Sequence, residues 1–320
     1  MVAMKNLLDR SILLVTGKGG VGKSTVAATL ARRAARDGKK VLLIELESVS
    51  RAAPLFGVAD AGPEAQLVDH NIWLMGVDAL SSLHYFALQQ LRLETVVRLA
   101  LRNKAVRGFF MAMPGIKSIL FLYHLWRLES EHGPAGDGRW DLIVCDLPTS
   151  GYAVGLYGVP TTLQQIFRVG PMAKYAAGMA AMLSDPKRAG LVLVTLPEEM
   201  PVVETVELIE RLRSRNNVEA AAVFVNGIYP ELVAPDEIEA LVAASVQAQA
   251  EAGPSQEMDG LLWAARLLAG RNARAERLLP LLRDEVGDRL IELPHLFRRH
   301  MHLSGIDELA AIVGARLAEA

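Results

Sequence analysis

A short segment near the start of the chain places glycine, lysine and hydroxyl side chains at a spacing suited to phosphate binding. GKGGVGKST fits the pattern G-x-x-x-x-G-K-[ST], which Gly17, Gly22, Lys23 and Ser24 satisfy. Glycines allow the backbone to curl so that successive N–H groups point at phosphate oxygens. Lys23 would then reach the β- and γ-phosphates of a nucleotide, and the Ser24 hydroxyl would hold Mg²⁺. The predicted phosphate-binding residues are Gly17, Gly19, Gly20, Val21, Gly22, Lys23, Ser24 and Thr25.

The residues around this loop supply the elements that a phosphate site needs. Residues 11–16 form an apolar run typical of a buried strand, and residues 24–37 have the pattern of a helix that ends at Gly38. A helix that begins at the loop directs the positive end of its dipole at the same phosphate oxygens. A glycine-rich turn without a ligand is the alternative interpretation, and this strand–loop–helix context disfavours it.

The loop carries a second lysine, Lys18, although Lys23 is enough to hold its own nucleotide. Lys18 stands at the opening turn, where its side chain is expected to point away from the phosphates. A cation there is best used on a second nucleotide held by a facing subunit, where it would neutralise the charge that develops as the γ-phosphoryl group leaves. A surface lysine without a role is the alternative.

Short β-rich runs alternate with helical patterns along the chain, which predicts an α/β fold with a doubly wound, mainly parallel sheet. The predicted strands are 11–16, 41–46, 72–77, 142–145, 191–196, 221–225 and 289–293. Two segments break this rhythm and are expected to be helical insertions, at about 81–131 and 160–184. The chain is interpreted as a single P-loop domain, 1–320, with a helical subdomain on one side of the sheet. EHGPAGDGRW and AEAGPSQEMDG are predicted to be exposed loops.

Composition narrows the classes of function. With 34 basic and 36 acidic residues the net charge is −2, so the basic excess of a dedicated nucleic-acid-binding protein is missing and no nucleic-acid partner is expected. The sequence shows no apolar run near the ~20 residues that span a bilayer and no signal-peptide pattern, which predicts a cytoplasmic protein without stable membrane insertion. The single cysteine, Cys145, permits neither an intrachain disulfide nor a multi-thiolate metal site, and it is expected to be a buried core residue.

Beyond the general pattern, KGGVGKST resembles the deviant Walker A motif of the SIMIBI class of P-loop ATPases. In that class the early lysine, here Lys18, marks dimers that sandwich two nucleotides between their subunits. Its members include ParA and MinD, the nitrogenase iron protein, and the ArsA group. The ArsA group contains the arsenite-pump ATPase and the GET-pathway factor that targets tail-anchored membrane proteins.

Further segments are similar to motifs of the ArsA group. KKVLLIELESVSRAAPLFG resembles its strand and switch I, and WDLIVCDLPTSGYAVGLYGVP resembles its switch II. The resemblance covers about the whole chain, since NIWLMGVDA, LVLVTLPEEMPVVETVELIERL, VFVNGIYP and IELPHLF are similar to four other elements. It implies that Glu47 positions the attacking water and that Asp146 lies in the outer shell of Mg²⁺. It also implies an adenine site formed by Asn226 with the loop residues Pro294 and Leu296.

Three departures from the ArsA pattern bear on turnover. The switch I aspartate is replaced by Glu47, which is one methylene longer, and the switch II histidine is replaced by Tyr152. The acidic pair of a PGxDE motif is missing after Pro114. A one-methylene change alters how a carboxylate can orient water, so these departures leave the efficiency of hydrolysis open.

The residues that bind metals in other members are missing as well. One cysteine cannot build the thiolate site of the arsenite pump, and the chain has no CxxC motif for a zinc ion shared between subunits. The bridging cluster of the nitrogenase iron protein needs two cysteines per subunit. The expected cofactors are ATP and Mg²⁺, with no zinc and no iron–sulfur cluster. A dimer would be held by protein contacts and by shared nucleotide.

Two apolar patterns have competing interpretations. A helical face near the C-terminus is opposed by acidic residues, which favours packing on the sheet over binding to a membrane surface. Its members are Ile306, Leu309, Ala310, Val313 and Leu317. The methionines of the helical insertions form either an adaptable groove for a hydrophobic client or ordinary core. They are Met111, Met113, Met172, Met179 and Met182.

The leading hypothesis is a Mg-ATP-dependent dimeric ATPase of the ArsA/GET type, either a homodimer or a heterodimer with a paralogue. Nucleotide-driven closing would capture or release a partner, with a hydrophobic or membrane-protein client as one candidate. Lys18, Glu47 and Asp146 are its catalytic candidates. A ParA/MinD-like positioning ATPase and a weakly hydrolysing regulatory subunit of a paired ATPase are the alternatives.

Overall fold

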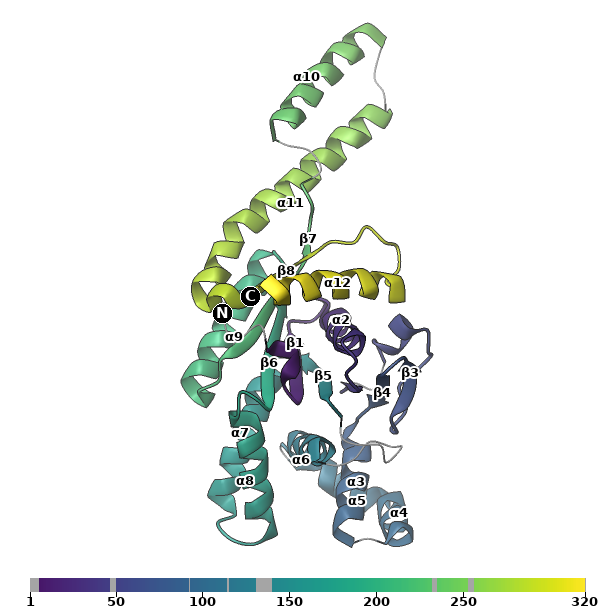
Figure 1. Cartoon of the computed structure of the whole chain (residues 1–320), viewed down its shortest axis with the longest axis vertical. Helices are drawn as coiled ribbons and strands as arrows, with labels where there is room; N and C mark the ends of the chain where they lie inside the picture. Colours follow the sequence, from purple (N-terminus) through teal and green to yellow (C-terminus); the bar gives the residue numbers. More distant parts are fainter. Residues whose placement is uncertain are drawn as a thin grey trace.

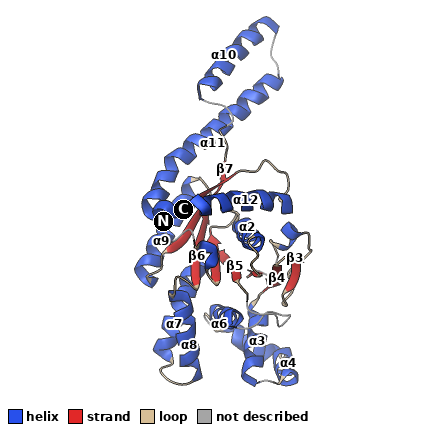
Figure 2. Ribbon diagram, in the orientation of Figure 1, coloured by secondary structure: helices blue, strands red, loops and turns tan. Residues whose placement is uncertain are grey.

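Within the part of the chain that the structure describes, the central element is an eight-stranded sheet with the order β3-β4-β2-β5-β1-β6-β7-β8 (Figure 1). The computed structural model describes residues 6–46, 50–91, 93–113, 115–130, 140–231, 235–252 and 256–319. The strands are β1 (Ile12–Gly17), β2 (Val41–Glu45), β3 (Gln66–Asp69), β4 (Ile72–Gly76), β5 (Leu142–Thr149), β6 (Ala189–Thr195), β7 (Ala220–Ile228) and β8 (Leu290–Pro294). All neighbouring pairs are parallel except β3 with β4 at one edge (Figure 2). The predicted α/β fold with a mainly parallel sheet is confirmed.

The strands differ from the sequence prediction at two places. β5 extends to Thr149 instead of ending at residue 145, because it continues beside β1 through a register shift between Val15 and Gly17. β3 was not predicted. Its four residues are exposed or half-buried and carry no clear alternation, and they reach the sheet through a turn in which Asn71 has a φ of 58°.

Helices cover both faces of the sheet, as a doubly wound fold requires. On one face, α2 (Lys23–Arg36) and α12 (Leu303–Glu319) pack on strand residues such as Leu13 and Val15. On the other face, α6 (Ile116–Ser130), α7 (Ser150–Ile166), α8 (Pro171–Ser184) and α9 (Glu199–Asn216) pack on Ile12 and Leu14. The apolar face of α12 that was predicted to pack on the sheet is buried in the first of these cores. Short 3₁₀ helices occur at Leu7–Asp9, Ala53–Phe56 and Gly287–Arg289.

One end of the molecule is helical. Residues 79–130 contain α3 (Ala79–Leu91), α4 (Glu94–Arg102), α5 (Lys104–Ala112) and α6, and these helices lie at the lower end of Figure 1 with α7 and α8. The segment expected to start an insertion at residue 160 belongs to α7, which already begins at Ser150. Pro160 lies inside α7, although an interior proline removes one helical hydrogen bond and crowds the carbonyl one turn earlier, so the proline suggested a helix start that the structure does not have. The single-domain organisation with insertions stays a prediction.

The opposite end carries a long helical hairpin that was not predicted. α10 (Pro235–Ala252) and α11 (Gln256–Val286) project from the upper end of Figure 1. The predicted loop AEAGPSQEMDG is therefore mostly helical where the structure describes it. Two acidic residues in the first turn of α11, Glu257 and Asp259, favour a helix start at that point. The other predicted loop, EHGPAGDGRW, lies outside the described residues except for Trp140.

Within the described ranges, none of the helices combines the length and the apolar character that crossing a membrane would require.

Candidate functional site

The glycine-rich loop leads from β1 directly into α2, and its backbone shows why glycine is needed. Gly20 and Gly22 have φ values of 85° and 91°, a left-handed conformation that side chains disfavour. At Gly17 a Cβ atom would lie 2.1 Å from the carbonyl oxygen of Val194, because β1 and β6 approach closely there. The loop therefore curls at the carboxyl edge of the sheet, with α2 starting at Lys23.

Lys23 and Asn226 occupy the inside of this loop. The side chain of Lys23 is buried, and its Nζ donates a hydrogen bond to the carbonyl oxygen of Lys18 at 3.0 Å. Asn226, on β7, donates from Nδ2 to the carbonyl oxygen of Val21 at 3.0 Å. A Cβ on Gly22 would lie 2.2 Å from the same Nδ2. Asn226 thus braces the loop, and adenine recognition by this residue remains a prediction.

The acidic side of the site comes from the neighbouring strand β5. Ser24 Oγ donates to Asp146 Oδ2 at 2.5 Å, and Asp146 is buried in register with Val15 of β1. Together with Lys23 these two residues line a small cleft. A hydroxyl and a carboxylate oxygen are hard ligands of the kind that Mg²⁺ prefers, so the residues present fit this metal. Thr25, the last predicted residue of the loop, is half-buried in the first turn of α2.

A second carboxylate in the cleft escaped the sequence analysis. Glu45, the last residue of β2, is 2% exposed and stands beside Asp146 in the sheet register. It accepts hydrogen bonds from the backbone N–H groups of Arg51 at 2.6 Å and Ala52 at 2.7 Å, and from the hydroxyl of Ser50. Glu45 therefore fastens residues 50–52 to the end of β2. An available signal was the spacing of Glu45 and Glu47, which would put both on one face of an extended strand.

Glu47, the predicted water-positioning residue, lies outside the described residues.

Lys18 is turned away from the loop interior. Its Nζ lies 2.6 Å from Glu204 Oε1 on α9, and both side chains are 36% exposed. The structure thus brings Lys23, Ser24 and Asp146 together and places the Lys18 ammonium outside this group. The assignment of Lys18 to a partner's nucleotide stays a prediction.

The predicted adenine-side loop follows β8. Pro294 pairs with Ile228 of β7, so this loop lies at the same edge of the sheet as Asn226, and Leu296 packs against the core. An aromatic cluster that the sequence analysis missed adjoins it. Tyr229 stacks on His295 with ring centroids 4.4 Å apart, and Phe297 packs edge-on against both. Burial is the main cause that lowers the pKa of His295, and the nearby Arg271 contributes.

Tyr152, which replaces the switch II histidine, points into the helical layer. It packs against the core beneath the sheet and shares a side-chain hydrogen bond with Ser118. Burial raises the pKa of Tyr152 to about 12, so its hydroxyl stays protonated at neutral pH. Cys145 is fully buried, which confirms the prediction of a core residue, and burial raises the pKa of its thiol.

The methionines divide between the two interpretations. Met179 and Met182 are buried in the core shared by α6, α7 and α8, so for these two residues the core interpretation holds. Met113 and Met172 are half-buried. The side chain of Met111 lies outside the described part of the structure.

A mainly parallel sheet, a glycine-rich loop between β1 and α2, and a serine–aspartate contact beside a buried lysine define a P-loop nucleotide-binding protein. Residues 10–179 and 171–250 match the sequence profile of the anion-transporting ATPase family. The chain belongs to this family, and it is an ATPase.

Individual relatives agree with this assignment. The ATPase BagA of Mycobacterium tuberculosis is 29% identical over 251 residues, which cover 73% of this chain and 70% of that protein. The arsenical pump-driving ATPase of Escherichia coli is 26% identical over 277 residues, or 78% of this chain and 45% of the pump ATPase. The ATPase asna-1 of Caenorhabditis elegans is 24% identical over 301 residues, or 77% and 84% of the two chains.

Proposed function

We propose that this chain is a Mg²⁺-dependent ATPase switch of the ArsA/GET type that closes as a dimer on ATP and uses that motion to capture or release a hydrophobic partner. The observation that carries the proposal is the contact between Ser24 Oγ and Asp146 Oδ2 beside the buried Lys23. It joins the phosphate loop to β5, the strand that continues into the helical end of the molecule.

The binding step uses the loop and the start of α2. Backbone N–H groups between Gly17 and Lys23 cradle the phosphates, and the helix dipole adds a positive field. Lys23 would exchange the Lys18 carbonyl for the β- and γ-phosphates. Ser24 would hold Mg²⁺ directly and Asp146 would hold it in the outer shell. When bound, this ion neutralises charge on the phosphate oxygens.

Lys18 would act on the nucleotide of the partner subunit. Its ion pair with Glu204 is over one-third exposed on both sides, and such pairs contribute only ~0–1 kcal/mol. Lys18 can therefore leave Glu204 at small cost when a facing subunit presents a triphosphate. There it would stabilise the charge on the departing γ-phosphoryl group. Glu47 would orient the attacking water, and Glu45 would hold the segment after β2 in place.

The coupling to a client would run along β5 and α7. β5 carries Asp146 and ends at Thr149, and α7 begins at the next residue, so a shift at the metal site moves the helix directly. The far ends of the helical layer expose many apolar side chains, more than single scattered residues would explain. They are Leu91, Leu93, Val96, Leu99 and Phe109 on one side, and Ile166, Phe167 and Val169 at the α7–α8 turn. This surface supports a hydrophobic client.

The experiment for this proposal measures the molar mass of the protein in solution by light scattering, with ATP, ADP or no nucleotide and with Mg²⁺ present. We expect doubling of the mass with ATP only, and in Lys18→Ala we expect the same doubling to need a higher protein concentration. A wild-type protein that has the same mass in all three states would contradict the nucleotide-driven dimer.

A second candidate is a weakly hydrolysing subunit that works with a more active paralogue. It is favoured by Tyr152, whose buried hydroxyl, with a pKa of about 12, stays protonated at neutral pH, whereas a histidine at this position could gain and lose a proton there. Turnover that is negligible alone and rises on addition of the paralogue would support this candidate. Equal turnover with and without the paralogue would exclude it.

A further inference from the structure

A pocket of about 410 Å³ lies at the amino ends of β1, β6 and β7, at the edge of the sheet opposite the phosphate loop. We call it the rear pocket and define it by Arg10, Tyr157, Leu183, Ala189, Asn216 and Glu219. Tyr157, Leu183 and Ala189 are buried and form its inner wall, whereas Glu219 is exposed at its mouth. Nothing in the proposed ATPase cycle uses these residues.

The rear pocket contains an arginine whose charge is not balanced by a neighbour. Arg10 Nη1 donates to the carbonyl oxygen of Ala189 at 3.2 Å, and Arg10 Nε is buried without a hydrogen-bond partner in the described structure. Among the described residues no carboxylate forms an ion pair with it. Burial lowers the pKa of Arg10, and Tyr157 is the one group that acts against this effect. Arg10 is half-buried, and a guanidinium with a buried, unpartnered Nε and no counter-ion is costly, which favours an anion at this site.

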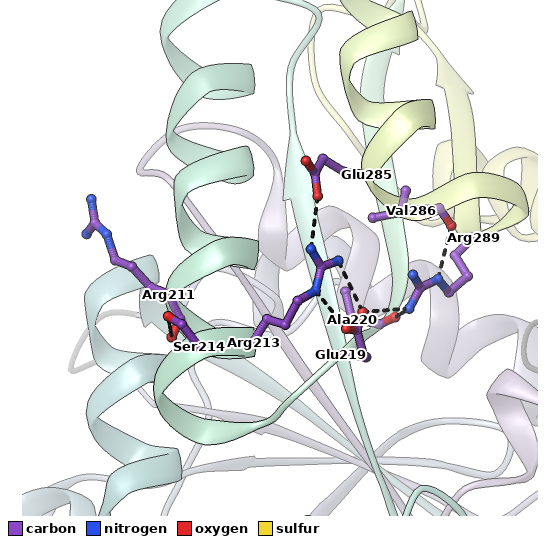
Figure 3. Close-up of polar contacts among 8 residues, drawn as sticks. All are labelled: Arg211, Arg213, Ser214, Glu219, Ala220, Glu285, Val286 and Arg289. Carbon is purple, nitrogen blue, oxygen red and sulfur yellow. Dashed lines mark hydrogen bonds and ion pairs between the residues drawn. The ribbon is translucent and has the colours of Figure 1, made fainter.

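The acidic residue at the mouth of the pocket is already neutralised by other arginines. Glu219 accepts from Arg213 Nε at 2.8 Å and from Arg289 Nη1 at 3.2 Å (Figure 3). The hydrogen bond from Arg213 is the largest of the causes that lower the pKa of Glu219. Arg213 also pairs with Glu285 at 3.2 Å. None of these hydrogen bonds and ion pairs includes Arg10, so its guanidinium remains the charge in the pocket without a counter-ion among the described residues.

Two further polar groups are available to a ligand. The Oδ1 atom of Asn216 is buried and has no hydrogen-bond partner in the described structure. The hydroxyl of Tyr157 forms no hydrogen bond with the described residues, and burial raises its pKa, so that it stays a donor at neutral pH. The rest of the lining includes the apolar side chains of Pro160, Leu183 and Leu191. A ligand with one anionic group and an apolar body would match Arg10, the Tyr157 hydroxyl and these apolar side chains, whereas Asn216 Oδ1 can only accept a hydrogen bond.

The local field favours a single negative charge over two. α8 ends at Ser184 and α9 ends at Asn216, and both ends line the pocket. Carbonyl groups at helix C-termini carry partial negative charge and disfavour additional anionic charge. One guanidinium matches a carboxylate through two parallel hydrogen bonds. A phosphate dianion would place a second charge against these helix ends.

We propose that the rear pocket binds a small organic monocarboxylate, with the carboxylate on Arg10 and its apolar body against Pro160, Leu183 and Leu191. The site lies at the amino ends of the strands and is separate from the residues proposed for the nucleotide, the metal and a client. A test of carboxylate binding therefore does not depend on whether the proposed ATPase cycle is correct.

Hexanoate is a suitable probe, and hexanamide is its neutral control of the same shape. Titration calorimetry on the full chain is expected to show saturable binding of hexanoate with a dissociation constant on the order of 1 mM, as a ligand of this size allows. Hexanamide is expected to bind at least about tenfold more weakly, because it lacks the charge that pairs with Arg10.

Variants locate the site. Arg10→Gln is expected to weaken hexanoate binding at least about tenfold, and Arg211→Gln, an exposed arginine outside the pocket, is expected to leave it unchanged. Gly190→Ala gives a second route, since a Cβ there would lie 2.7 Å from Arg10 Cδ and 2.9 Å from Nη1 and would displace the guanidinium without removing it. Tyr157→Phe deletes only the hydroxyl and is expected to weaken binding about threefold to tenfold.

The proposal would be overturned by an absence of saturable binding at ~50 mM hexanoate, far above the expected dissociation constant. Equal affinity for hexanoate and hexanamide would overturn it too. So would equal affinity in wild type and Arg10→Gln. Circular dichroism establishes whether each variant is folded. If Arg10→Gln does not fold, hexanoate affinities equal to the wild type in both Gly190→Ala and Tyr157→Phe would overturn the proposal.

Discussion

Lys18 Nζ lies 2.6 Å from Glu204 Oε1, so the extra lysine of the phosphate loop is held by α9 of its own chain. The two residues are 186 positions apart in the sequence, and the contact keeps the ammonium clear of Lys23. Because both side chains are partly exposed, the ion pair is weak enough to break when a facing subunit presents a triphosphate. In the proposed dimer Lys18 exchanges Glu204 for a partner's phosphate.

The first prediction concerns this ion pair. Glu204→Gln removes the competing charge, so ATP-dependent dimerisation is expected to become up to about fivefold tighter, which corresponds to ~1 kcal/mol. Sedimentation velocity with ATP and Mg²⁺ measures the change. Glu207→Gln on the same helix is the matched control, because the ion-pair partner of Glu207 is Arg211, which is not part of the phosphate loop. Weaker dimerisation in Glu204→Gln than in this control would contradict the exchange.

The second prediction concerns the metal. Removal of Mg²⁺ with EDTA is expected to lower the affinity of the wild type for ATP, because the bound ion neutralises charge on the phosphate oxygens. Ser24→Ala and Asp146→Asn are expected to bind ATP weakly with or without the metal, because each removes one oxygen of the pair that suits Mg²⁺. Fluorescent-nucleotide titration with and without EDTA measures this, and Ser214→Ala on the surface of α9 is the control. An unchanged EDTA effect in both site variants would argue against the assignment.

The third prediction concerns the shape of the loop. Gly22→Ala places a Cβ 2.2 Å from Asn226 Nδ2 at a φ of 91°, and strain of this kind costs ~1–3 kcal/mol. ATP affinity is expected to fall at least about tenfold. Gly270→Ala in α11, outside the loop, should be nearly neutral by comparison, because nothing lies within 4 Å of its Cβ position.

The pair Gly22→Ala/Asn226→Ala tests the clash separately from the backbone strain. Removing the Asn226 amide relieves the contact but leaves the left-handed φ. The double variant is therefore expected to regain part of the ~1–3 kcal/mol by which strain in Gly22→Ala lowers the free energy of unfolding. Full recovery in the double variant would show that the backbone conformation is not the constraint.

The fourth prediction concerns pH. His124 stacks on Tyr85 with ring centroids 4.0 Å apart and joins α6 to α3, and burial lowers its pKa to about 4. The unfolded chain binds a proton near pH 6.5 that the folded chain does not, so the free energy of unfolding falls as pH decreases from 6.5 to 4. The contribution of this group over that window is ~3 kcal/mol.

Urea unfolding between pH 7 and 4.5 measures the effect. His124→Phe keeps an aromatic ring in the stack and is expected to flatten the dependence, whereas His300→Gln on the surface is expected to retain it. A His124→Phe variant with the wild-type slope would show that another group is responsible.

The parts of the fold that follow local rules could be predicted from the sequence. Strands β1, β2 and β6 were predicted to within two residues because strands buried on both faces are continuous apolar runs. The glycine loop was predicted because left-handed φ values at Gly20 and Gly22 leave glycine as the favoured residue. The assignment of the Ser24 hydroxyl to the metal site followed from the same motif.

Other features depend on contacts between distant segments. The Lys18–Glu204 pair joins the loop to α9, and the hydrogen bond from Asn226 to Val21 joins it to β7. The strand order, which brings these segments together, cannot be read from local sequence. In the sequence, Glu45 does not differ from an ordinary strand residue. Its role follows from the hydrogen bonds that it accepts from the backbone of Arg51 and Ala52. The helices α10 and α11 were missed because the glycine and proline between them in the sequence suggested a longer loop.

The central claim is that Lys18 of one subunit completes the ATP site of the other. Lys18→Ala and Lys23→Ala are each expected to abolish ATP turnover when assayed alone. In an equimolar mixture, half of the dimers pair the two variants, and each such dimer has one site with Lys23 from one chain and Lys18 from the other. Phosphate release by the mixture is therefore expected to recover to roughly a quarter of the wild-type rate, since one site in four is complete. A mixture that forms dimers and stays inactive would contradict the account.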